Sequence, residues 1–455
     1  MGDAFMTVRL AWASRIIDSI AAVPAVVWRV ALWIFVVLLI VASTYRYAEK
    51  VHKVSRDGTL TKSAFLRWRD QIQGLERGDD IYHKYNYPNP PIQALILWPL
   101  TELDRFPGAM VWFFLKVVMA IVAIIWSIRI CESPGSVIPL WAKTVAIIFS
   151  LHPILGDLSH GNVNIFIAFL VLGSLEAFRR RWDYSAGLVL SLAIACKVTP
   201  ALFLPYFVWK RAWKTVAACL VGCGIWLFVV PGAILGWQQN NTLLTSWFDT
   251  MVRPFIIDGK VTSEHSNQSI PGLTFRLLTN EPSVIGYDEE DHKPLGLEFH
   301  NITDIGASGA RWVIRGFQAA FVVCIVVLCW TPVNGASGVR SGLRIGAEFS
   351  LVLIGMLLFS ERTWKHHGVV LILPLLLISM AVACSPLWSW FRAFLISMFC
   401  LGLLLTIGPS LLNAEWQDLS LTYGSHTVMF LMMFAASGVI LFNENRLANR
   451  TTNIA

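Results

Sequence analysis

The chain of 455 residues is rich in apolar side chains, which make up 56% of it, whereas charged residues make up only 14%. Soluble domains carry about 25% charged residues. Together with a mean hydropathy of +0.60, this composition excludes a soluble enzyme, a secreted disulfide scaffold and a disordered binding segment. The net charge of +7 is attributed to Lys and Arg in cytoplasmic loops rather than to a nucleic-acid partner.

Several runs of the chain are long and apolar enough to cross a bilayer core of about 30 Å. We predict membrane spans near 27–46, 107–130, 136–153, 162–179, 213–235, 311–331, 344–360, 367–384, 388–411 and 425–442. Residues 8–22 predict an interfacial amphipathic helix. The eight cysteines include no CxxC pair, and we expect them to pack as small apolar side chains. The sequence therefore predicts an all-α polytopic membrane protein, with one integral membrane domain over residues 1–455.

The segment 185–208 is apolar but contains Lys197 and Pro200. As one span it would place the cationic residues of 179–181 and 210–214 on opposite sides of the membrane, against the positive-inside rule. Pro200 disfavours helical geometry at the preceding residue and removes a backbone donor. We therefore predict a broken helix or re-entrant hairpin here, and keep a single span as the alternative.

With both termini in the cytoplasm, the cationic clusters all face the cytoplasm. The other side then receives two long loops, 47–106 and 236–310, and all ten His lie in outer loops or at outer ends of spans. This pattern predicts an extracytoplasmic active site in a bacterial-type plasma membrane. The alternative is that long loops simply collect polar residues.

The first long loop contains carboxylates that could act as a base. Asp57 is our first candidate, because a carboxylate in a partly dry cleft can deprotonate a sugar hydroxyl. Three other acids are further candidates: Asp79, Asp80 and Asp157. For any one of these acids, a solvated structural role is the alternative.

A Pro-rich segment, YNYPNPP, follows in the same loop and excludes a regular helix there. Its Tyr87 and Asn89 are candidates for substrate contact, since Tyr rings suit an interface or a sugar. The apolar run Ile92–Leu100 is too short to span and suits a re-entrant or surface helix.

Polar side chains also gather at the mouth between the third and fourth predicted spans. His160, Asn162 and Asn164 offer a dense set of hydrogen-bonding groups, and Gly161 between them permits close backbone approach. Capping of the next helix by Asn162 is the alternative. Lys197 lies in an otherwise apolar stretch, where an ammonium indicates a functional site with an anionic partner. Its structural alternative is an ion pair with a buried carboxylate such as Asp157.

Two more clusters complete the candidate site. In SERTWKHH, the cationic groups Arg362, Lys365 and His366 could neutralise a phosphate, although an interfacial anchor is the alternative. Adjacent His366 and His367 point to different sides of a helix, so we predict no metal site. Asn267 and Gln268 in the second long loop are polar but unspecific by themselves.

Five blocks of the chain resemble the family-87 membrane glycosyltransferases, the class that includes polyprenol-phosphate-mannose-dependent mannosyltransferases. In family order from about residue 60 to 385, the blocks are YNYPNPPIQALILWPL, HGNVN, AGLVLSLAIACKVTPALFLPY, SNQSI and SERTWKHH. The resemblance implies a GT-C architecture with about 10–12 transmembrane helices. It implies inverting, metal-independent transfer of a hexose, such as mannose, from a polyprenyl-phosphate donor to an acceptor hydroxyl on the extracytoplasmic face. The implied partners are that donor, a lipid or glycan acceptor and the bilayer, with no cofactor.

In such enzymes an aspartate just beyond the first span deprotonates the acceptor. Family members usually carry an acid beside an aromatic residue upstream of the Gly-x-x-Tyr element. This chain has no acid over residues 61–65, and Asp57 is the nearest one upstream. Asp57 and His366 are accordingly the catalytic candidates, and Lys197, Arg362 and Lys365 are candidates for binding the leaving phosphate.

The main alternative function is a transporter or flippase, because broken helices and intramembrane Lys also occur there. Transporters commonly contain two similar halves, and we find no such repeat. The long outer loops also favour an enzyme. A purely structural membrane scaffold is a third possibility.

Overall fold

The structure is a computed structural model that describes residues 19, 22–57, 63–133, 135–287, 294–330, 340–384 and 389–452. The predicted amphipathic helix at 8–22 lies almost entirely outside these residues. Within them the chain is helical except for loops and one small hairpin of strands, β1 (Val284–Tyr287) and β2 (Pro294–Glu298), which pair antiparallel. The all-α polytopic membrane architecture is confirmed.

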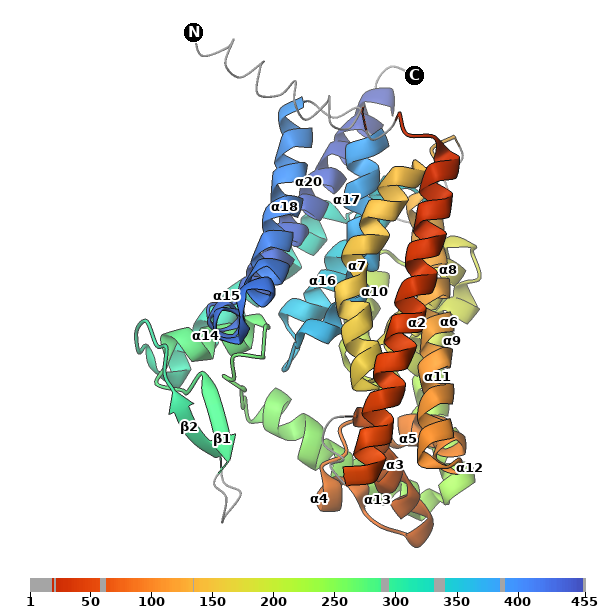
Figure 1. The fold of residues 1–455 in the computed structure, drawn as a ribbon, viewed down its shortest axis with the longest axis vertical. Helices are drawn as coiled ribbons and strands as arrows, with labels where there is room; N and C mark the ends of the chain where they lie inside the picture. The colour runs from red at the N-terminus through yellow and green to blue at the C-terminus, as the bar shows by residue number, and fades with distance from the viewer. Residues whose placement is uncertain are drawn as a thin grey trace.

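Long helices form a single bundle whose axes run roughly along the vertical of Figure 1. In chain order its helices are α2 (Ala25–Asp57), α6 (Arg105–Cys131), α7 (Leu140–His160), α8 (Asn164–Arg179), α9 (Asp183–Cys196), α10 (Phe203–Trp209), α11 (Trp213–Gly224), α12 (Val230–Leu235), α15 (Gly306–Leu328), α16 (Leu343–Leu358), α17 (Ile372–Cys384), α18 (Ser389–Leu412) and α20 (Ser425–Thr452). One end of the bundle carries the short helices α3 (Ala64–Ile72), α4 (Ile81–Tyr85), α5 (Pro91–Thr101) and α13 (Trp237–Trp247), and we call it the loop end. α2 begins and α20 ends at the opposite end.

Seven helices in the described part of the chain are long and apolar enough to cross a membrane. They are Ala25–Lys53, Arg105–Cys131, Trp213–Leu235, Gly306–Leu328, Lys365–Cys384, Trp390–Pro409 and Ser425–Leu447. Three further predicted spans correspond to α7, α8 and α16. α8 and α16 have only 16 residues each, and α7 is interrupted by Lys143, His152 and Asp157. These three helices run within the bundle beside the longer ones.

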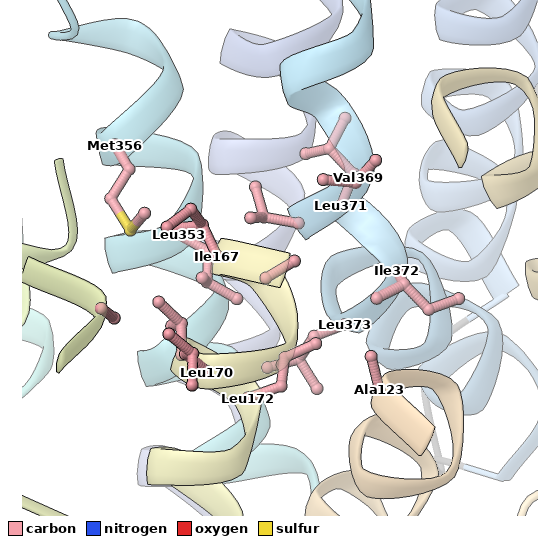
Figure 2. Packing of buried hydrophobic residues seen from close by; sticks show 14 of the residues in the cluster. Ala123, Ile167, Leu170, Leu172, Leu353, Met356, Val369, Leu371, Ile372 and Leu373 are labelled. Carbon is pink, nitrogen blue, oxygen red and sulfur yellow. The ribbon is translucent and has the colours of Figure 1, made fainter. Parts of the chain in front are cut away.

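The core lies where α6, α8, α16 and α17 meet (Figure 2). Nearly every side chain of α8 and α16 is buried, including Ile167 and Leu170 of α8 and Leu353 of α16. A helix that is apolar on all sides must be surrounded by other helices. This explains why α8 and α16 can be short: neighbouring helices, rather than lipid, cover them.

The segment 185–208 reverses direction between α9 and α10, at the 3₁₀ turn η3 (Thr199–Leu202). Lys197, after α9, lies beside Asn164 at the start of α8. Phe207 of α10 then packs on Phe178 at the far end of α8, with ring centroids 4.8 Å apart. The cationic residues on both sides of the segment therefore lie at the same end of the bundle, opposite the loop end. Entry of this hairpin into the bilayer from one face stays a prediction.

Buried ion pairs hold the far end of this hairpin in place. Lys210 pairs with Glu348 of α16 at 2.8 Å, and Tyr206 donates a hydrogen bond to the same carboxylate at 2.7 Å. Arg340 pairs with Asp183 at the start of α9. These contacts fix α9 and α10 relative to α16 and so fix the position of Lys197.

The first long loop begins later than predicted, because α2 continues to Asp57 instead of ending near residue 46. Residues 47–57 contain no Gly or Pro, and Tyr47 and Val51 are buried against the bundle, so the helix continues. The remainder of this loop folds as α3 (Ala64–Ile72), the 3₁₀ turn η2 (Gln73–Arg77), α4 (Ile81–Tyr85) and α5 (Pro91–Thr101). α5 is the short helix predicted at Ile92–Leu100, with Pro91 in its first turn.

The second long loop, 236–310, is also mostly folded. It contains α13 (Trp237–Trp247), the π-helix η5 (Phe248–Ile257), α14 (Ile270–Leu278) and the β-hairpin. α13 packs against α4 and α5, so the two long loops meet at the loop end (Figure 1). The short helix α19 (Ala414–Thr422) follows α18, and α20 then returns into the bundle.

Candidate functional site

A fully buried carboxylate, Asp157, organises the junction of α6, α7 and α8. It pairs with Lys116 of α6 at 3.4 Å, and the same ammonium donates to the Asp157 carbonyl oxygen at 2.8 Å. Its other contacts are Asn164 Nδ2, which donates to Oδ1 at 2.9 Å, and the Ile165 amide, which donates to Oδ2 at 3.2 Å. Asp157 thereby caps α8 from a neighbouring helix. With these four bonds and no exposed surface, Asp157 is tied into the fold, and its role as a base stays a prediction.

Lys197 reaches this carboxylate only through Asn164, whose Oδ1 accepts from Lys197 Nζ at 2.7 Å. The predicted alternative, a direct ion pair with Asp157, is not the arrangement in the structure, because Lys116 occupies that place. The two lysines and one aspartate carry a net charge of +1. Since burying an uncompensated charge is costly, this cluster favours an anion beside it.

Lys197 also lines a small pocket that opens to solvent, with about 340 Å³ of empty space when the adjoining solvent is included. We call it the Lys197 pocket. Its other lining residues come from α8, η3, α16, the loop after α16 and the 3₁₀ segment η6 (Lys365–Leu371): Asn164, Ile167, Thr199, Met356, Leu357, Ser360, Thr363, His367 and Val370. One cation, several hydroxyls and an imidazole can together hold a phosphate group.

The HGNVN segment forms the turn between α7 and α8. Gly161 has φ +65°, the left-handed conformation that favours glycine at a helix C-terminus. A Cβ there would come within 3.0 Å of Tyr47 Oη and Ser63 Oγ. Trp112 donates to the Gly161 carbonyl at 3.1 Å, and Lys50 donates to the Ser159 carbonyl at 2.7 Å. The turn is therefore held between α2 and α6.

Two histidines meet at the surface of this turn. The rings of His160 and His366 are stacked, with centroids 5.1 Å apart and planes 17° apart. Asn162 donates to His366 Nε2 at 3.2 Å, and its own Oδ1 accepts from the Val163 amide. Asn162 thus touches both the start of α8 and the candidate catalytic histidine. His366 is absent from the lining of the Lys197 pocket, which instead contains His367.

The candidate bases lie in different surroundings. Asp57 is the last residue of α2, about 10 Å beyond Lys50 along the helix axis; its side chain lies outside the described atoms. Asp79 is bound by Lys84 at 2.8 Å, and this hydrogen bond lowers the pKa of the Asp79 carboxyl. Asp80 accepts from the Tyr82 and His83 amides and so caps α4. Asp79 and Asp80 therefore have structural partners, and the role of Asp57 stays a prediction.

Tyr87 and Asn89 lie in the interior of the first loop rather than on its surface. Tyr87 is fully buried and donates to Gln93 Oε1, and Asn89 Nδ2 donates to the same oxygen at 3.3 Å. The Asn89 carbonyl accepts from Tyr82 at 2.9 Å. These contacts shape the loop around α5, and substrate contact by either residue stays a prediction.

Asn267 and Gln268 connect three separate segments of the chain. Asn267 donates to the carbonyls of Thr262 and Glu361, each at 2.9 Å. Gln268 donates to the Leu421 carbonyl at 2.7 Å and accepts from the His426 amide. Both side chains are buried and hydrogen-bonded, so they fix the loop after α16, and their predicted contact with substrate remains untested.

Arg362 and Lys365 diverge from the Lys197 pocket. Arg362 is half-exposed, pairs with Glu361 at 3.2 Å and lies over the Phe255 ring. Lys365 begins the 3₁₀ segment η6 (Lys365–Leu371), which leads into α17, and lines a different pocket from Lys197. The cations predicted to share one phosphate are therefore distributed over separate surfaces.

Lys116 is the functional-site residue that the sequence prediction missed. It lies within the predicted span 107–130 and is not among the candidate residues of the sequence analysis. A lone cation inside an apolar run is itself a signal of a functional site or a buried partner, and this signal had identified Lys197. In the described part of the chain, no group of three or more His, Cys, Asp or Glu side chains is placed to hold a metal ion.

The family model of glycosyltransferase family 87 matches residues 87–360, more than half of the chain. The chain belongs to glycosyltransferase family 87. Asp57, Arg362, Lys365 and His366 lie outside the matched residues, whereas the Asp157 junction and Lys197 lie within them.

Two curated relatives of this family-87 chain are mycobacterial proteins. A polyprenol-phosphate-mannose-dependent alpha-(1-2)-phosphatidylinositol mannoside mannosyltransferase of Mycobacterium tuberculosis is 26% identical over 64% of this chain and 61% of its own length. A protein of the same description from Mycolicibacterium smegmatis is 27% identical over 58% of this chain and 51% of its own length. The chain thus spans between half and two thirds of these relatives. The solved structure of ArnT from Cupriavidus metallidurans in the apo state is similar with a TM-score of 0.36 and 14% identity, over 92% of this chain and 76% of that one.

Proposed function

We propose that this protein is a membrane glycosyltransferase of GT-C architecture that moves a hexose from a polyprenyl-phosphate donor to an acceptor hydroxyl. Mannose is the sugar that we assign, because the relatives' names specify polyprenol-phosphate-mannose. Transfer takes place at the loop end, which we assign to the extracytoplasmic side, with both termini in the cytoplasm. The observation that carries this proposal is the net positive cluster of Lys116, Asp157 and Lys197 beside a pocket.

The chemistry requires two events at the anomeric carbon. The acceptor oxygen loses its proton to a base and forms a bond to this carbon, while the bond from carbon to the phosphate oxygen breaks. The electron pair goes to the leaving phosphate, whose negative charge grows. A fixed positive charge stabilises that growing charge more than the ground state, which is the role that we assign to Lys197. A single displacement inverts the anomeric configuration, and no metal is required in this scheme.

The positions of the remaining groups fit this scheme. α2 brings Asp57 to the loop end, on the same side of the bundle as the HGNVN turn. His366 and His160 present stacked imidazoles at that turn, where they can orient an acceptor. The lipid tail of the donor remains in the bilayer, which accounts for a sugar-handling site on a membrane-spanning scaffold.

The test is a transfer assay on purified protein in nanodiscs. Radiolabelled polyprenyl-phosphate-mannose is supplied with phosphatidylinositol mannosides, and the labelled product is separated and identified by mass spectrometry. We expect product from wild type and about 100-fold slower turnover from Lys197→Ala. Lys143→Ala is the matched control, because Lys143 pairs with Glu132 at the opposite end of the bundle. Movement of labelled lipid between leaflets without any product would instead support the flippase alternative.

A further inference from the structure

A second pocket lies on the other side of η6 from the Lys197 pocket. It lies between α7, η6, α17, α18 and α20 and opens to solvent, with about 470 Å³ of empty space when the adjoining solvent is included. We call it the Lys365 pocket. Its lining residues are Phe149, His152, Pro153, Lys365, Gly368, Leu371, Leu375, Thr406, Ile407, His426, Met429, Phe430 and Met433. The proposed function does not use it.

The winding of η6 separates the two pockets. In a 3₁₀ helix, side chains three positions apart lie in one row. Lys365, Gly368 and Leu371 form the row that faces the Lys365 pocket. His367 and Val370 form another row, which faces the Lys197 pocket. His366 belongs to a third row and stacks on His160. One short segment therefore borders two pockets and carries a candidate catalytic residue between them.

The Lys365 pocket is polar at one end and apolar at the other. His426 and Lys365 stand at the starts of α20 and η6, at the loop-end side of these helices, and His152 lies on α7 beside them. Deeper in the bundle, Met433 is about 10 Å farther along α20 than His426. Leu375 is about 18 Å farther along than Lys365, because η6 rises about 2.0 Å per residue. This gradient along the bundle axis matches a lipid with its headgroup at the loop end and its chain directed into the bilayer.

The charge of the polar end is not balanced by the protein. Among the described residues, no carboxylate lies within ion-pair distance of Lys365, and its side chain forms no hydrogen bond. A second basic side chain, His152, points to the same pocket. A half-buried ammonium without a carboxylate partner can bind an anionic ligand, and the apolar lining below suits an anion that carries a hydrocarbon chain.

We propose that the Lys365 pocket binds a membrane phospholipid with a phosphodiester headgroup, which is held by Lys365 and His152 while its chain lies along α17, α18 and α20. Combined with the proposed function, this pocket is the site of the second substrate, a phosphate-bearing lipid acceptor. The acceptor then lies across η6 from the donor. The binding claim stands without transfer, whereas the acceptor role rests on the proposed function.

Photo-crosslinking tests the binding claim in the absence of any sugar donor. Purified full-length protein in nanodiscs receives phosphatidylinositol with a diazirine in its acyl chain, and the labelled residues are mapped by mass spectrometry. We expect labels on Met429, Met433 and Leu375, competed by unlabelled phosphatidylinositol. Loss of one charge-assisted hydrogen bond weakens binding about tenfold. Lys365→Ala should therefore raise, by that factor, the concentration of unlabelled phosphatidylinositol that is needed to prevent crosslinking. Lys365→Arg should retain most binding, and Lys143→Ala all of it.

A variant that fills the pocket covers the case in which Lys365→Ala fails to fold. Met433→Trp leaves Lys365 in place and should remove the labels on α20 and α17. Equal labelling of wild type, Lys365→Ala and Met433→Trp overturns the proposal. Preferential labelling by diazirine-bearing polyprenyl phosphate also overturns it, because the pocket would then belong to the donor. If the pocket binds phosphatidylinositol and the transfer assay yields no product, only the proposed function fails; transfer without this binding rejects the pocket alone.

Discussion

Asn164 stands between Lys197 and Asp157, accepting a hydrogen bond from the first at 2.7 Å and donating one to the second at 2.9 Å. An amide suits this place because it offers an acceptor and a donor on one side chain. The lysine is thereby oriented without being neutralised, since the formal charge of Asp157 is balanced by Lys116.

The first prediction changes this amide to a carboxylate. Asn164→Asp lowers the net charge of the cluster from +1 to 0 and pairs Lys197 directly. We expect the affinity for polyprenyl-phosphate-mannose to fall at least about tenfold, measured by binding of labelled donor to protein in nanodiscs. Asn241→Asp, at an exposed position of α13, should leave the affinity unchanged. If Asn164→Asp and Asn241→Asp bound the donor with equal affinity, Lys197 would have no role in binding the donor phosphate.

The second prediction concerns Lys197 and His366, which border different surfaces of η6. Lys197→Ala and His366→Ala should each lower turnover by about two orders of magnitude. Residues that act on separate groups have additive free-energy effects. The double variant should therefore lose close to the product of the two factors, as measured in single-turnover transfer. A double variant no slower than either single one would show that both act on one charge.

The third prediction assigns the base. Asp57→Asn should lower transfer by about 10²–10⁴-fold with donor binding retained. Asp79→Asn and Asp80→Asn affect the ion pair with Lys84 and the cap of α4, so they should lower thermal stability more than turnover per folded molecule. Wild-type turnover in Asp57→Asn, together with slow turnover in Asp80→Asn, would assign the base to Asp80 at the start of α4. The mechanism itself would be unchanged.

The fourth prediction concerns the side of the membrane. Single cysteines at Arg181 and Arg211 should resist a membrane-impermeant maleimide added to intact cells. Cysteines at Asn241 and Asn280, both exposed in the second long loop, should react. The background carries Cys384→Ser and Cys400→Ser, because these two native thiols are exposed. Labelling at 181 together with protection at 280 would reverse the proposed orientation.

The fifth prediction uses Glu361, which lies between α16 and η6. Burial raises the pKa of its carboxyl from 4.5 to about 7, although Arg362 and Lys260 oppose this shift. Between these values the folded state binds more protons than the unfolded state, so stability falls as pH rises from about 4.5 to about 7. Glu361→Gln stays neutral and should raise the Tm relative to wild type at pH 7.5 but not at pH 4. Glu102→Gln, at an exposed position, is the control. If the Tm of Glu361→Gln varied with pH in parallel with that of wild type, the prediction would be contradicted.

The helices could largely be predicted because long apolar runs have one stable state in a bilayer. The predicted span 107–130, for instance, is α6 at Arg105–Cys131. The extension of α2 to Asp57 could not be predicted from hydropathy, since it depends on burial of Tyr47 and Val51 against the bundle.

The site could be predicted as a set of polar clusters but not as an arrangement. Sequence identifies Asn267 and Tyr87 as polar groups in a membrane protein, yet both use their hydrogen-bonding atoms within the fold. Likewise, nothing in the order of residues shows that Lys197 and Lys365 lie on opposite sides of η6. That separation follows from a 3₁₀ rather than an α-helical turn, and from tertiary packing on both sides of it.

The seven residues of η6 form an unusually long 3₁₀ run, since such runs rarely exceed about four residues. Rewinding it as an α-helix would shorten it by about 0.5 Å per residue and turn successive members of a row apart by about 60°. Lys365 and His367 would then leave their pockets in the same movement. A ligand that favours one winding in either pocket must change affinity in the other by the same factor. If η6 adopts both windings, the two sites are thermodynamically linked through the pitch of a single helical segment.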